Sequence, residues 1–295
     1  MVTISDIKKF KPTFDFLVGI DSDGTVFDSM NIKHSLCFID PLINIYKLNK
    51  VSYQSEQMWK EINLFSINRG INRFEALSIF FEKLKFLNLD AISNYDYPNL
   101  NFINHLKSLN IPLTDKNLKK LKYNIDENQY YDIKKAILWS DTVNKKVANL
   151  VKNVPLIPGA SKTINYICKH ADIIVVSNTP SAVLRYDWSN CNINNSVSLI
   201  CGQETGSKID ILEAAIIEKY DKEKVLMIGD SPSDFYAAKK NDISFFPIIP
   251  GKEDSSWAFL ESKVLSRFFS IEKNSKFERE KIIEFESAIN AKLNY

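Results

Sequence analysis

Three short apolar runs, each ending in polar residues, constrain the fold of this 295-residue chain more than any other feature. They read FLVGID at 16–21, DIIVVS at 172–177 and VLMIGD at 225–230. Short runs of β-branched and aliphatic residues are typical of strands that are buried on both faces of a parallel sheet. Two weaker runs predict further strands at 196–201 and 244–248.

Helical patterns separate these strands, at about 159–170, 180–189, 207–219 and 233–241. Alternating strands and helices predict an α/β fold with a doubly wound, Rossmann-like parallel sheet. Ligands of such sheets bind beyond the carboxyl ends of the strands. We therefore expect the polar residues that end the main runs to converge on one crevice. These residues are Asp21, Ser177 and Asp230.

Glycine is unevenly distributed along the chain. Seven of the eight glycines lie before residue 25 or after residue 158, and only Gly70 falls between them. Because glycine supplies the tight turns between strands and helices, the middle of the chain is expected to be mainly helical. Its clearest helix is predicted at 126–153, where Asp126 and Glu127 suit the positive end of the helix dipole.

These patterns predict two domains. Residues 1–29 and 155–295 are expected to form the α/β core, which ends in an amphipathic helix at about 276–295. Residues 30–154 are expected to form a large helical domain. Its insertion directly after the first strand is a natural position for a lid over the crevice.

The composition excludes several classes of protein. A net charge of +2 gives no electrostatic reason to expect nucleic acid or a membrane as a partner. No run approaches the ~18 apolar residues of a transmembrane helix. The N-terminal segment lacks the apolar run of a signal peptide, and neither the four cysteines nor the three histidines have the spacing of zinc ligands. We expect a cytoplasmic protein, and the sequence leaves its oligomeric state open.

The first candidate site is Asp21-Ser22-Asp23-Gly24-Thr25, at the end of the first strand. Of two carboxylates placed there, one can attack phosphorus while the other protonates the leaving oxygen. Gly24 permits a sharp turn, and we expect Gly24 and Thr25 to contact the phosphate. An acidic turn without a function would also contain aspartate and glycine, so this motif alone does not distinguish a catalytic site from a turn.

Two further candidate sites follow later strands. Ser177 and Asn178 offer a hydroxyl and backbone N–H groups at a strand-to-helix turn, which suit a phosphoryl oxygen but also suit a simple helix cap. Lys208 opens a helix and could hold the nucleophile and balance the phosphate charge. A lone lysine is more often a solvated surface residue.

The fourth candidate site is Gly229-Asp230-Ser231-Pro232-Ser233-Asp234. Asp230 ends an apolar strand, and Asp234 lies one helical turn further on, so both can face the same point. Carboxylate oxygens suit Mg²⁺, which usually takes one or two of them together with waters and phosphate.

Together, these four elements resemble the four motifs of the haloacid dehalogenase superfamily, in its phosphatase branch. The resemblance covers roughly residues 14–30 and 155–250. It implies that Asp21 is the nucleophile, which forms an aspartyl-phosphate. It also implies that Asp23 is the general acid and base, whose backbone carbonyl binds Mg²⁺. Residues 30–154 would then form a helical cap between the first and second motifs.

The same resemblance implies roles for the other motifs. Ser177 and Asn178 would bind the phosphoryl group, and Lys208 would orient it, so that Ser177 and Lys208 belong to the catalytic set. The implied Mg²⁺ ligands are Asp21, Asp23, Asp230 and Asp234.

Asp23 separates the branches of this family. Dehalogenases and phosphonoacetaldehyde hydrolases lack an aspartate at this position, whereas the poor alkoxide leaving group of a phosphate ester needs an acid. The sequence therefore predicts a Mg²⁺-dependent phosphohydrolase acting on a small phosphate monoester. A phosphomutase or phosphotransferase similar to β-phosphoglucomutase is the alternative, because it would share every core residue. An inactive binding protein is less favoured, because all expected core residues are present.

Arg69 and Arg73 are the candidate substrate-binding residues of the helical region. They are four residues apart, so they could share one helix face and hold a second phosphate or a carboxylate. A solvated or structural arginine pair is the other interpretation. Nothing in the sequence identifies the substrate.

Overall fold

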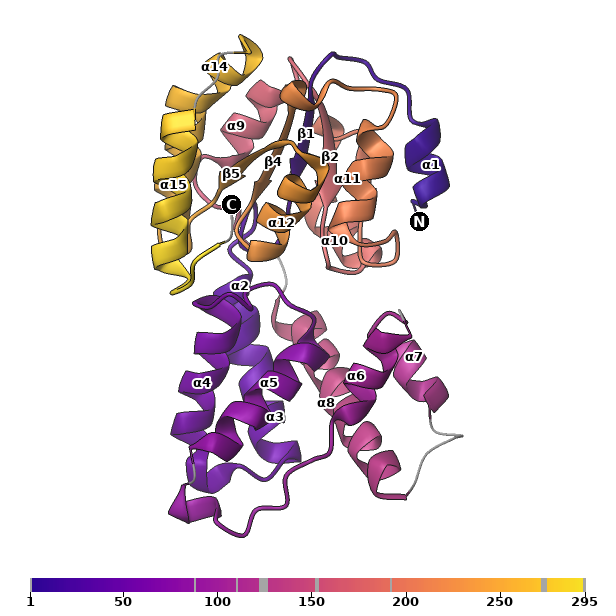
Figure 1. Ribbon diagram of the computed structural model, residues 1–295, viewed down its shortest axis with the longest axis vertical. Helices are drawn as coiled ribbons and strands as arrows, with labels where there is room; N and C mark the ends of the chain where they lie inside the picture. The colour runs from indigo at the N-terminus through magenta and orange to yellow at the C-terminus, as the bar shows by residue number, and fades with distance from the viewer. Residues whose placement is uncertain are drawn as a thin grey trace. The chain divides into compact units, whose positions relative to one another are not determined.

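The computed structural model describes residues 2–87, 89–109, 111–121, 127–151, 154–191, 193–271 and 275–293. The chain divides into two compact units. Unit 1 consists of Met1–Met30, Phe65–Gly70 and Asn153–Tyr295, and unit 2 consists of Asn31–Leu64 and Ile71–Lys152. Figure 1 labels most of the helices and strands of both units.

Unit 1 is built on a parallel sheet of five strands in the order β3-β2-β1-β4-β5. The strands are β1 (Leu17–Ile20), β2 (Asp172–Val176), β3 (Leu199–Cys201), β4 (Val225–Gly229) and β5 (Ser244–Pro247). Leu17 of β1 pairs with Asp172 of β2 on one side and with Val225 of β4 on the other. The predicted doubly wound α/β sheet is therefore confirmed, and β1 lies at its centre.

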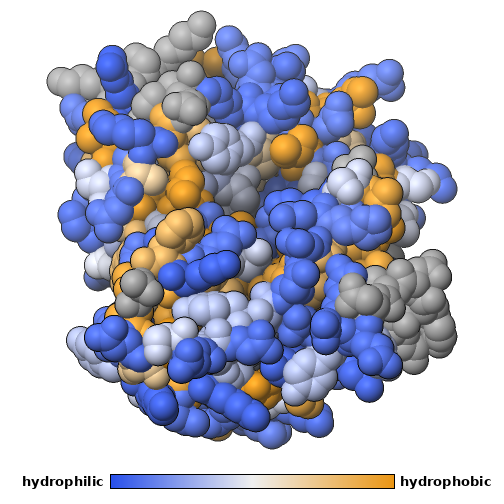
Figure 2. Space-filling model, turned by 60° about the horizontal axis from the view of Figure 1, so that its bottom comes forward, coloured by the Kyte–Doolittle hydropathy of each residue, from blue (hydrophilic) through white to orange (hydrophobic). Residues whose placement is uncertain are grey.

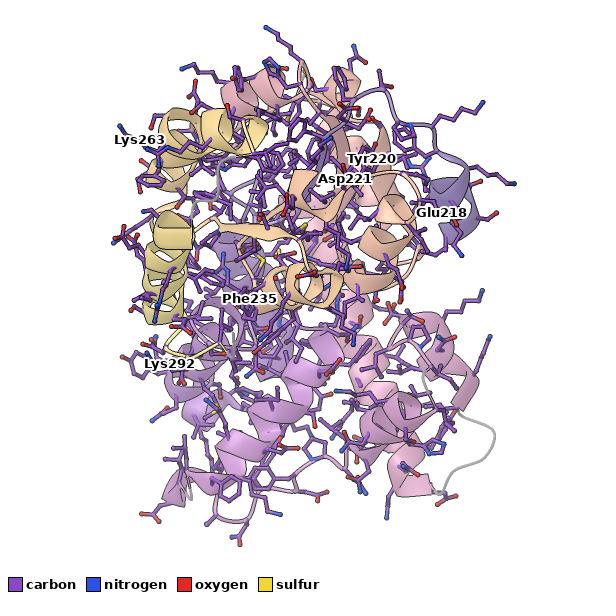
Figure 3. All side chains as sticks on the ribbon, turned by 45° about the horizontal axis from the view of Figure 1, so that its top comes forward. Glu218, Tyr220, Asp221, Phe235, Lys263 and Lys292 are labelled. Atoms are coloured by element: carbon purple, nitrogen blue, oxygen red, sulfur yellow. The ribbon has the colours of Figure 1, made fainter. Side chains whose placement is uncertain are left out.

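Helices cover both faces of this sheet (Figure 1). On one face a single buried cluster joins the strands to α1 (Ile4–Lys9), α11 (Lys208–Ile216), α12 (Pro232–Asn241) and α15 (Ser275–Ala288). In this cluster Phe235 of α12 (Figure 3) packs edge-on against Phe245 of β5. On the other face Phe246 of β5 stacks on Phe259 of α13 (Glu253–Phe259). The remaining helices of unit 1 include α9 (Ala160–Ile167), α10 (Ser181–Ser189), the π-helical turn η7 (Leu260–Val264) and α14 (Leu265–Phe269).

Burial on both faces of the sheet explains why the central strands are apolar runs. Every residue of β1, β2 and β4 is buried, because helices exclude water from both faces of the sheet. Gly19 of β1 lies where the packing is close. A Cβ atom there would lie 3.0 Å from the sulfur of Met227 and 3.1 Å from a methyl group of Leu212.

The predicted C-terminal helix is also confirmed as α15, but it ends at Ala288 rather than at about 295; residues 294 and 295 of that prediction lie outside the described residues. Ile282, Phe285 and Ile289 are buried in the cluster of unit 1. Ile283 of the same helix is exposed.

Unit 2 is helical wherever its described residues form regular structure. Its helices are α3 (Ile39–Ile45), α4 (Ser52–Leu64), α5 (Arg73–Phe86), α6 (Asn101–Ser108), α7 (Asp115–Lys120) and α8 (Glu127–Leu150). The short α2 (Met30–Ile32) leads into a π-helical turn, η1 (Lys33–Phe38), and 3-10 turns lie at Asn49–Val51 and Asp90–Ile92. The helix predicted at 126–153 is confirmed as α8, whereas Asp126, Lys152 and Asn153 lie outside the described residues.

Aromatic side chains fill the core of unit 2. The rings of Trp59 and Trp139 meet edge to face with their centroids 5.6 Å apart, and Phe38, Phe74 and Phe80 pack around them. Such pairs prefer edge-to-face contacts and add to the stabilisation by burial. Packing of large rings therefore holds this unit together.

The surface is predominantly hydrophilic on the face shown in Figure 2. The exposed large hydrophobic residues come from different elements, among them Tyr53 in α4, Phe86 in α5 and Tyr186 in α10. Among the described residues, no helix combines the length and the hydrophobicity that a membrane crossing requires.

Candidate active site

Three carboxylates meet at the carboxyl end of the sheet. Asp21 directly follows β1, Asp230 directly follows β4, and Asp234 lies in the first turn of α12. An oxygen atom from each lies within 4.8 Å of the others, and all three residues are buried. They meet because β1 and β4 are neighbours in the sheet, so that their polar ends emerge side by side.

Lys208 links two of these carboxylates. It is the first residue of α11, whose start is fixed by a capping box between Ser207 and Asp210. The Nζ atom of Lys208 lies 3.0 Å from Oδ1 of Asp21 and 2.6 Å from Oδ1 of Asp234. One buried ammonium group thus pairs with two buried carboxylates, which lowers the free-energy cost of removing all three charges from water.

Burial dominates the electrostatics of this cluster. It raises the pKa of Asp21 well above its ordinary value; Lys208 opposes this shift, and Asp234 and Asp230 add to it. Burial also raises the pKa of Asp234, against the effect of Lys208. Burial alone would lower the pKa of Lys208, but the carboxylates of Asp21 and Asp234 prevail and raise it. The ammonium group therefore stays charged, and a further cation would favour ionised carboxylates.

Asp230 is held by two other side chains. Nε and Nη2 of Arg69 lie 2.7 and 2.6 Å from its Oδ2 atom, and Oγ1 of Thr25 donates to its Oδ1 atom at 2.9 Å. Arg69 is only 4% exposed. Thr25, predicted to contact phosphate, is thus bonded to a carboxylate of the cluster in this structure.

The expectation that Arg69 and Arg73 share one helix face is wrong. Helix α5 begins only at Arg73, since Gly70 has a φ of 74° and the side chain of Asn72 caps the helix by accepting from the amide of Phe74. Arg69 belongs to the Phe65–Gly70 segment of unit 1, whereas Arg73 belongs to unit 2.

Arg73 has its partners within unit 2. Its Nη1 atom donates to Oδ1 of Asn144 at 2.7 Å and to Oγ of Ser140 at 3.2 Å. Its guanidinium group also lies 5.4 Å from the ring centroid of Phe38. The structure therefore places the two arginines in different surroundings.

Asp23 lies beside the cluster and accepts two hydrogen bonds from hydroxyl groups. Oγ of Ser29 donates to Oδ1, and Oγ1 of Thr179 donates to Oδ2 at 2.5 Å. These two hydroxyls orient the carboxylate, and sequence reasoning did not assign a role to either. Thr179 directly follows Ser177 and Asn178, so its place in that motif was the signal that could have identified it.

Ser177 and Asn178 follow β2 as predicted, but they differ in exposure. Ser177 is buried; its amide donates to the carbonyl of Cys201, and its Oγ atom accepts from the amide of Thr179. Asn178 is exposed, and its Nδ2 atom donates to the carbonyl oxygen of Gly70 at 3.3 Å. This contact ties the loop after β2 to the Phe65–Gly70 segment.

Glycine is needed at two places where the backbone approaches the carboxylates. Gly24 has a φ of 77°, and a Cβ atom there would lie 2.3 Å from Oδ2 of Asp230. A Cβ atom at Gly229 would lie 2.3 Å from Cγ of Asp234. Any side chain at either position would displace a carboxylate of the cluster.

Two tryptophans that are distant in the sequence form hydrogen bonds with the loop after β1. Nε1 of Trp188 donates to Oγ of Ser22 at 3.0 Å, and Nε1 of Trp257 donates to the carbonyl oxygen of Thr25 at 2.8 Å. Sequence reasoning missed both residues, because their partners lie 166 and 232 positions away and no periodic pattern links them.

The acidic cluster fits a hard divalent cation such as Mg²⁺. Asp21, Asp230 and Asp234 offer the carboxylate oxygens that Mg²⁺ prefers. When ionised, these three groups exceed the two positive groups that contact them, Lys208 and Arg69, by one negative charge. A bound cation would compensate the excess charge.

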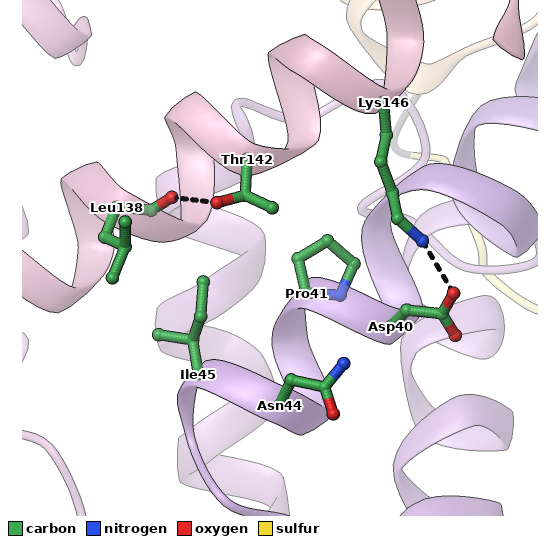
Figure 4. Close-up of a pocket in the computed structure, with 7 residues that line it drawn as sticks. All are labelled: Asp40, Pro41, Asn44, Ile45, Leu138, Thr142 and Lys146. Atoms are coloured by element: carbon green, nitrogen blue, oxygen red, sulfur yellow. Dashed lines mark hydrogen bonds and ion pairs between the residues drawn. The ribbon is translucent and has the colours of Figure 1, made fainter. Parts of the chain in front are cut away.

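A separate hollow of about 230 Å³ lies in unit 2 between α3 and α8 (Figure 4). Its charged side chains, Asp40 and Lys146, form an ion pair of 2.6 Å, and Oγ1 of Thr142 donates to the carbonyl oxygen of Leu138. No residue predicted to take part in chemistry lines this hollow.

Comparison with known families identifies the chain. The family model of haloacid dehalogenase-like hydrolases matches residues 84–248, which is more than half of the chain. The protein therefore belongs to the haloacid dehalogenase-like hydrolases, and the resemblance read from the four motifs is confirmed. The matched region contains Ser177, Lys208, Asp230 and Asp234, whereas Asp21 precedes it.

Several solved structures are similar to the chain at low sequence identity. A protein assigned to the haloacid dehalogenase-like hydrolases from Bacteroides fragilis has a TM-score of 0.50 and 16% identity, over 83% of this chain and 93% of that chain. A predicted phosphoglycolate phosphatase from Haemophilus somnus has a TM-score of 0.46 and 16% identity, over 79% and 84% of the two chains. The HAD-hydrolase YfnB from Bacillus subtilis, described as bound to magnesium, has a TM-score of 0.43 and 15% identity, over 79% and 86%. No curated protein matches the chain.

Proposed function

We propose that this haloacid dehalogenase-like hydrolase is a Mg²⁺-dependent phosphohydrolase that acts on a small phosphate monoester through an aspartyl-phosphate on Asp21. The observation that carries the proposal is the buried cluster in which Lys208 bridges Asp21 and Asp234 beside Asp230. Buried charges on this scale are costly to a fold, and they gather where a site needs them for chemistry.

In the first half of the reaction, a carboxylate oxygen of Asp21 attacks phosphorus, and the bond from phosphorus to the ester oxygen breaks. Asp23 gives its proton to that leaving oxygen. Lys208 holds the attacking carboxylate through Oδ1 and offsets the charge of the phosphoryl group. When bound, a Mg²⁺ ion held by Asp21, Asp230 and Asp234, and by the backbone carbonyl of Asp23, would offset further charge on the phosphoryl oxygens.

In the second half, Asp23 takes a proton from water, and the resulting hydroxide attacks phosphorus. The bond between Asp21 and phosphorus breaks, which releases inorganic phosphate and restores the carboxylate. The hydroxyls of Ser29 and Thr179 keep Asp23 oriented through both halves. Ser177, Asn178, Gly24 and Thr25 are proposed to bind the phosphoryl oxygens at the carboxyl end of the sheet.

We also propose that unit 2 acts as a cap that selects the substrate, with Arg73 as one of its anion-binding residues. Arg73→Ala is then expected to raise KM for a substrate that carries a second anionic group and to spare a small aryl phosphate. Equal effects on both substrates would contradict this role.

The four free cysteines, two of them buried, support a reducing, cytoplasmic location.

The proposed function is tested with p-nitrophenyl phosphate, with and without Mg²⁺, for the wild type and for Asp21→Asn. We expect Mg²⁺-dependent turnover that Asp21→Asn abolishes. Turnover that survives Asp21→Asn in a preparation free of contaminating phosphatases would refute the mechanism. If the wild type is inactive, acetyl phosphate is the next substrate to test, because a phosphotransferase with the same core residues would accept a phosphoryl donor of this kind.

A further inference from the structure

Arg69 occupies a carboxylate oxygen of Asp230 that a bound cation could otherwise use as a ligand. Both Nε and Nη2 approach the same carboxylate oxygen, Oδ2 of Asp230, at 2.7 and 2.6 Å. Arg69 is 4% exposed and Asp230 is 1% exposed, so water screens this ion pair poorly. Two N–H groups on one buried oxygen form a strong, charge-assisted contact.

The other oxygen of Asp230 is also engaged, because Oδ1 accepts from Oγ1 of Thr25. A cation that binds Asp230 through Oδ2 would meet a positively charged guanidinium group at hydrogen-bond distance from the same atom. The two positive charges repel one another, and this repulsion is strong where water is excluded. Metal binding at Oδ2 therefore requires Arg69 to move.

The segment that carries Arg69 is held at the site by its own contacts. Phe65–Gly70 groups with unit 1, although the residues on both sides of it group with unit 2. The amide of Arg69 donates to the carbonyl of Ser66, and Asn178 donates to the carbonyl of Gly70. Gly70 also packs closely, since a Cβ atom there would lie 2.9 Å from Cβ of Ser231.

We infer that Arg69 is a resident counter-cation of Asp230, which competes with Mg²⁺ and thereby sets the affinity of the metal site. This inference rests on the proposed metal site. In the metal-free protein Arg69 offsets one of the three buried negative charges, and Mg²⁺ has to displace the guanidinium group from Oδ2 before it can use that oxygen.

The test is a calorimetric titration of the purified, metal-free protein with MgCl₂ alone. Arg69→Gln is expected to bind Mg²⁺ at least about tenfold more tightly than the wild type, because the competing charge is gone. Arg69→Lys should fall between them, since its ammonium group keeps the charge without the paired N–H groups. The control is Arg73→Gln, which removes an arginine whose partners among the described residues lie in unit 2 and should bind Mg²⁺ as the wild type does.

A second readout does not depend on activity. Without Mg²⁺, Arg69→Gln should unfold at a lower temperature than the wild type, because Asp230 loses its positive partner. Saturating Mg²⁺ should raise its unfolding temperature by more than it raises that of the wild type. Arg69→Lys provides the same comparison if Arg69→Gln folds poorly.

The outcomes separate this inference from the proposed function. If the wild type binds Mg²⁺ and Arg69→Gln binds it equally or more weakly, competition by Arg69 is refuted while the metal site stands. If only the Arg69 variants bind Mg²⁺, the inference is supported in its strongest form. If neither the wild type nor any variant binds Mg²⁺, both the metal site and the inference fail.

Discussion

The two units bury polar groups in opposite ways. Unit 1 gathers five buried charged side chains in the acidic cluster, where Lys208 and Arg69 contact the three carboxylates within 3.0 Å. In unit 2, four buried side-chain atoms have no hydrogen-bond partner among the described residues, namely the hydroxyls of Tyr46 and Ser55, the indole nitrogen of Trp139 and Oδ1 of Asp115. Asp115 is nevertheless not left unpaired, because its Oδ2 atom accepts from Nδ2 of Asn144. The fold thus tolerates an unpaired neutral group in the aromatic core, whereas each buried charge in the site has a partner.

This difference follows from the cost of burial. An unpaired hydroxyl or indole N–H costs a few kcal/mol at most, whereas an unpaired charge costs far more and would unfold a marginally stable protein. The charges of the acidic cluster are therefore expected to persist for function rather than for stability. Substitutions in each unit can test this difference.

Removing the shared ammonium group should have the largest effect. Lys208→Met leaves Asp21 and Asp234 buried without their common partner and is expected to lower kcat for p-nitrophenyl phosphate about 10³-fold or more, equivalent to about 4 kcal/mol. The matched control is Lys222→Met, whose ammonium group forms an exposed pair with Asp242. Wild-type kcat in folded Lys208→Met would show that the cluster is not the site of the chemistry.

Removing an aromatic ring from unit 2 should instead act on stability. Phe80 is fully buried against Trp59 and Phe81, so Phe80→Ala is expected to lower the free energy of unfolding by about 3–4 kcal/mol. Phe86 lies in the same helix but is 88% exposed, and Phe86→Ala should cost less than about 0.5 kcal/mol. Urea denaturation measures both values. Similar losses would mean that the ring cluster does not hold unit 2 together.

The sequence was sufficient to predict the sheet and most of the cluster, for a physical reason. A strand covered on both faces has to be an uninterrupted apolar run, so β1, β2 and β4 are visible in the sequence. Parallel strands end at the same edge, and that rule places Asp21 and Asp230 at one edge of the sheet. The order of the strands carries no comparable local signal, and the sequence did not reveal it.

Contacts between distant side chains could not be predicted in this way. Helical spacing suggested that Arg69 lies beside Arg73, but Gly70 and the Asn72 cap separate them, and Arg69 instead meets Asp230 from 161 positions away. Likewise, nothing local links Trp188 to Ser22. Such contacts depend on which surfaces meet after folding rather than on any repeat in the sequence.

Neutralising the nucleophile should stabilise the metal-free protein. Burial raises the pKa of Asp21, so its ionised form destabilises the fold at every pH above the unfolded value of 3.8, increasingly until the folded pKa is passed. Asp21→Asn is therefore expected to raise the free energy of unfolding by about 1–2 kcal/mol near neutral pH. The gain should disappear below about pH 4, where the wild-type carboxyl group is protonated in both states.

Thermal unfolding in EDTA at both pH values measures this gain. Asp172→Asn serves as the opposite control, since Asp172 accepts from the amides of Thr13 and Phe14 and from the hydroxyl of Tyr220 (Figure 3). It should destabilise the protein, because an amide cannot accept all three bonds equally well. A loss of stability in Asp21→Asn near neutral pH would mean that Asp21 is retained for structure rather than for chemistry.

The smallest effect should come from two tryptophans in the core of unit 2. Trp59 and Trp139 are fully buried neighbours, but only Trp59 has a hydrogen-bond partner among the described residues, as its Nε1 atom donates to Nδ1 of His34 at 3.2 Å. Substitution of either by phenylalanine removes a similar volume, so the difference between the two variants reports the hydrogen bond. Trp59→Phe should cost about 1 kcal/mol more than Trp139→Phe in urea denaturation. Equal costs would mean that the N–H group of Trp139 also has a partner, such as an ordered water, and would weaken the contrast between the two units.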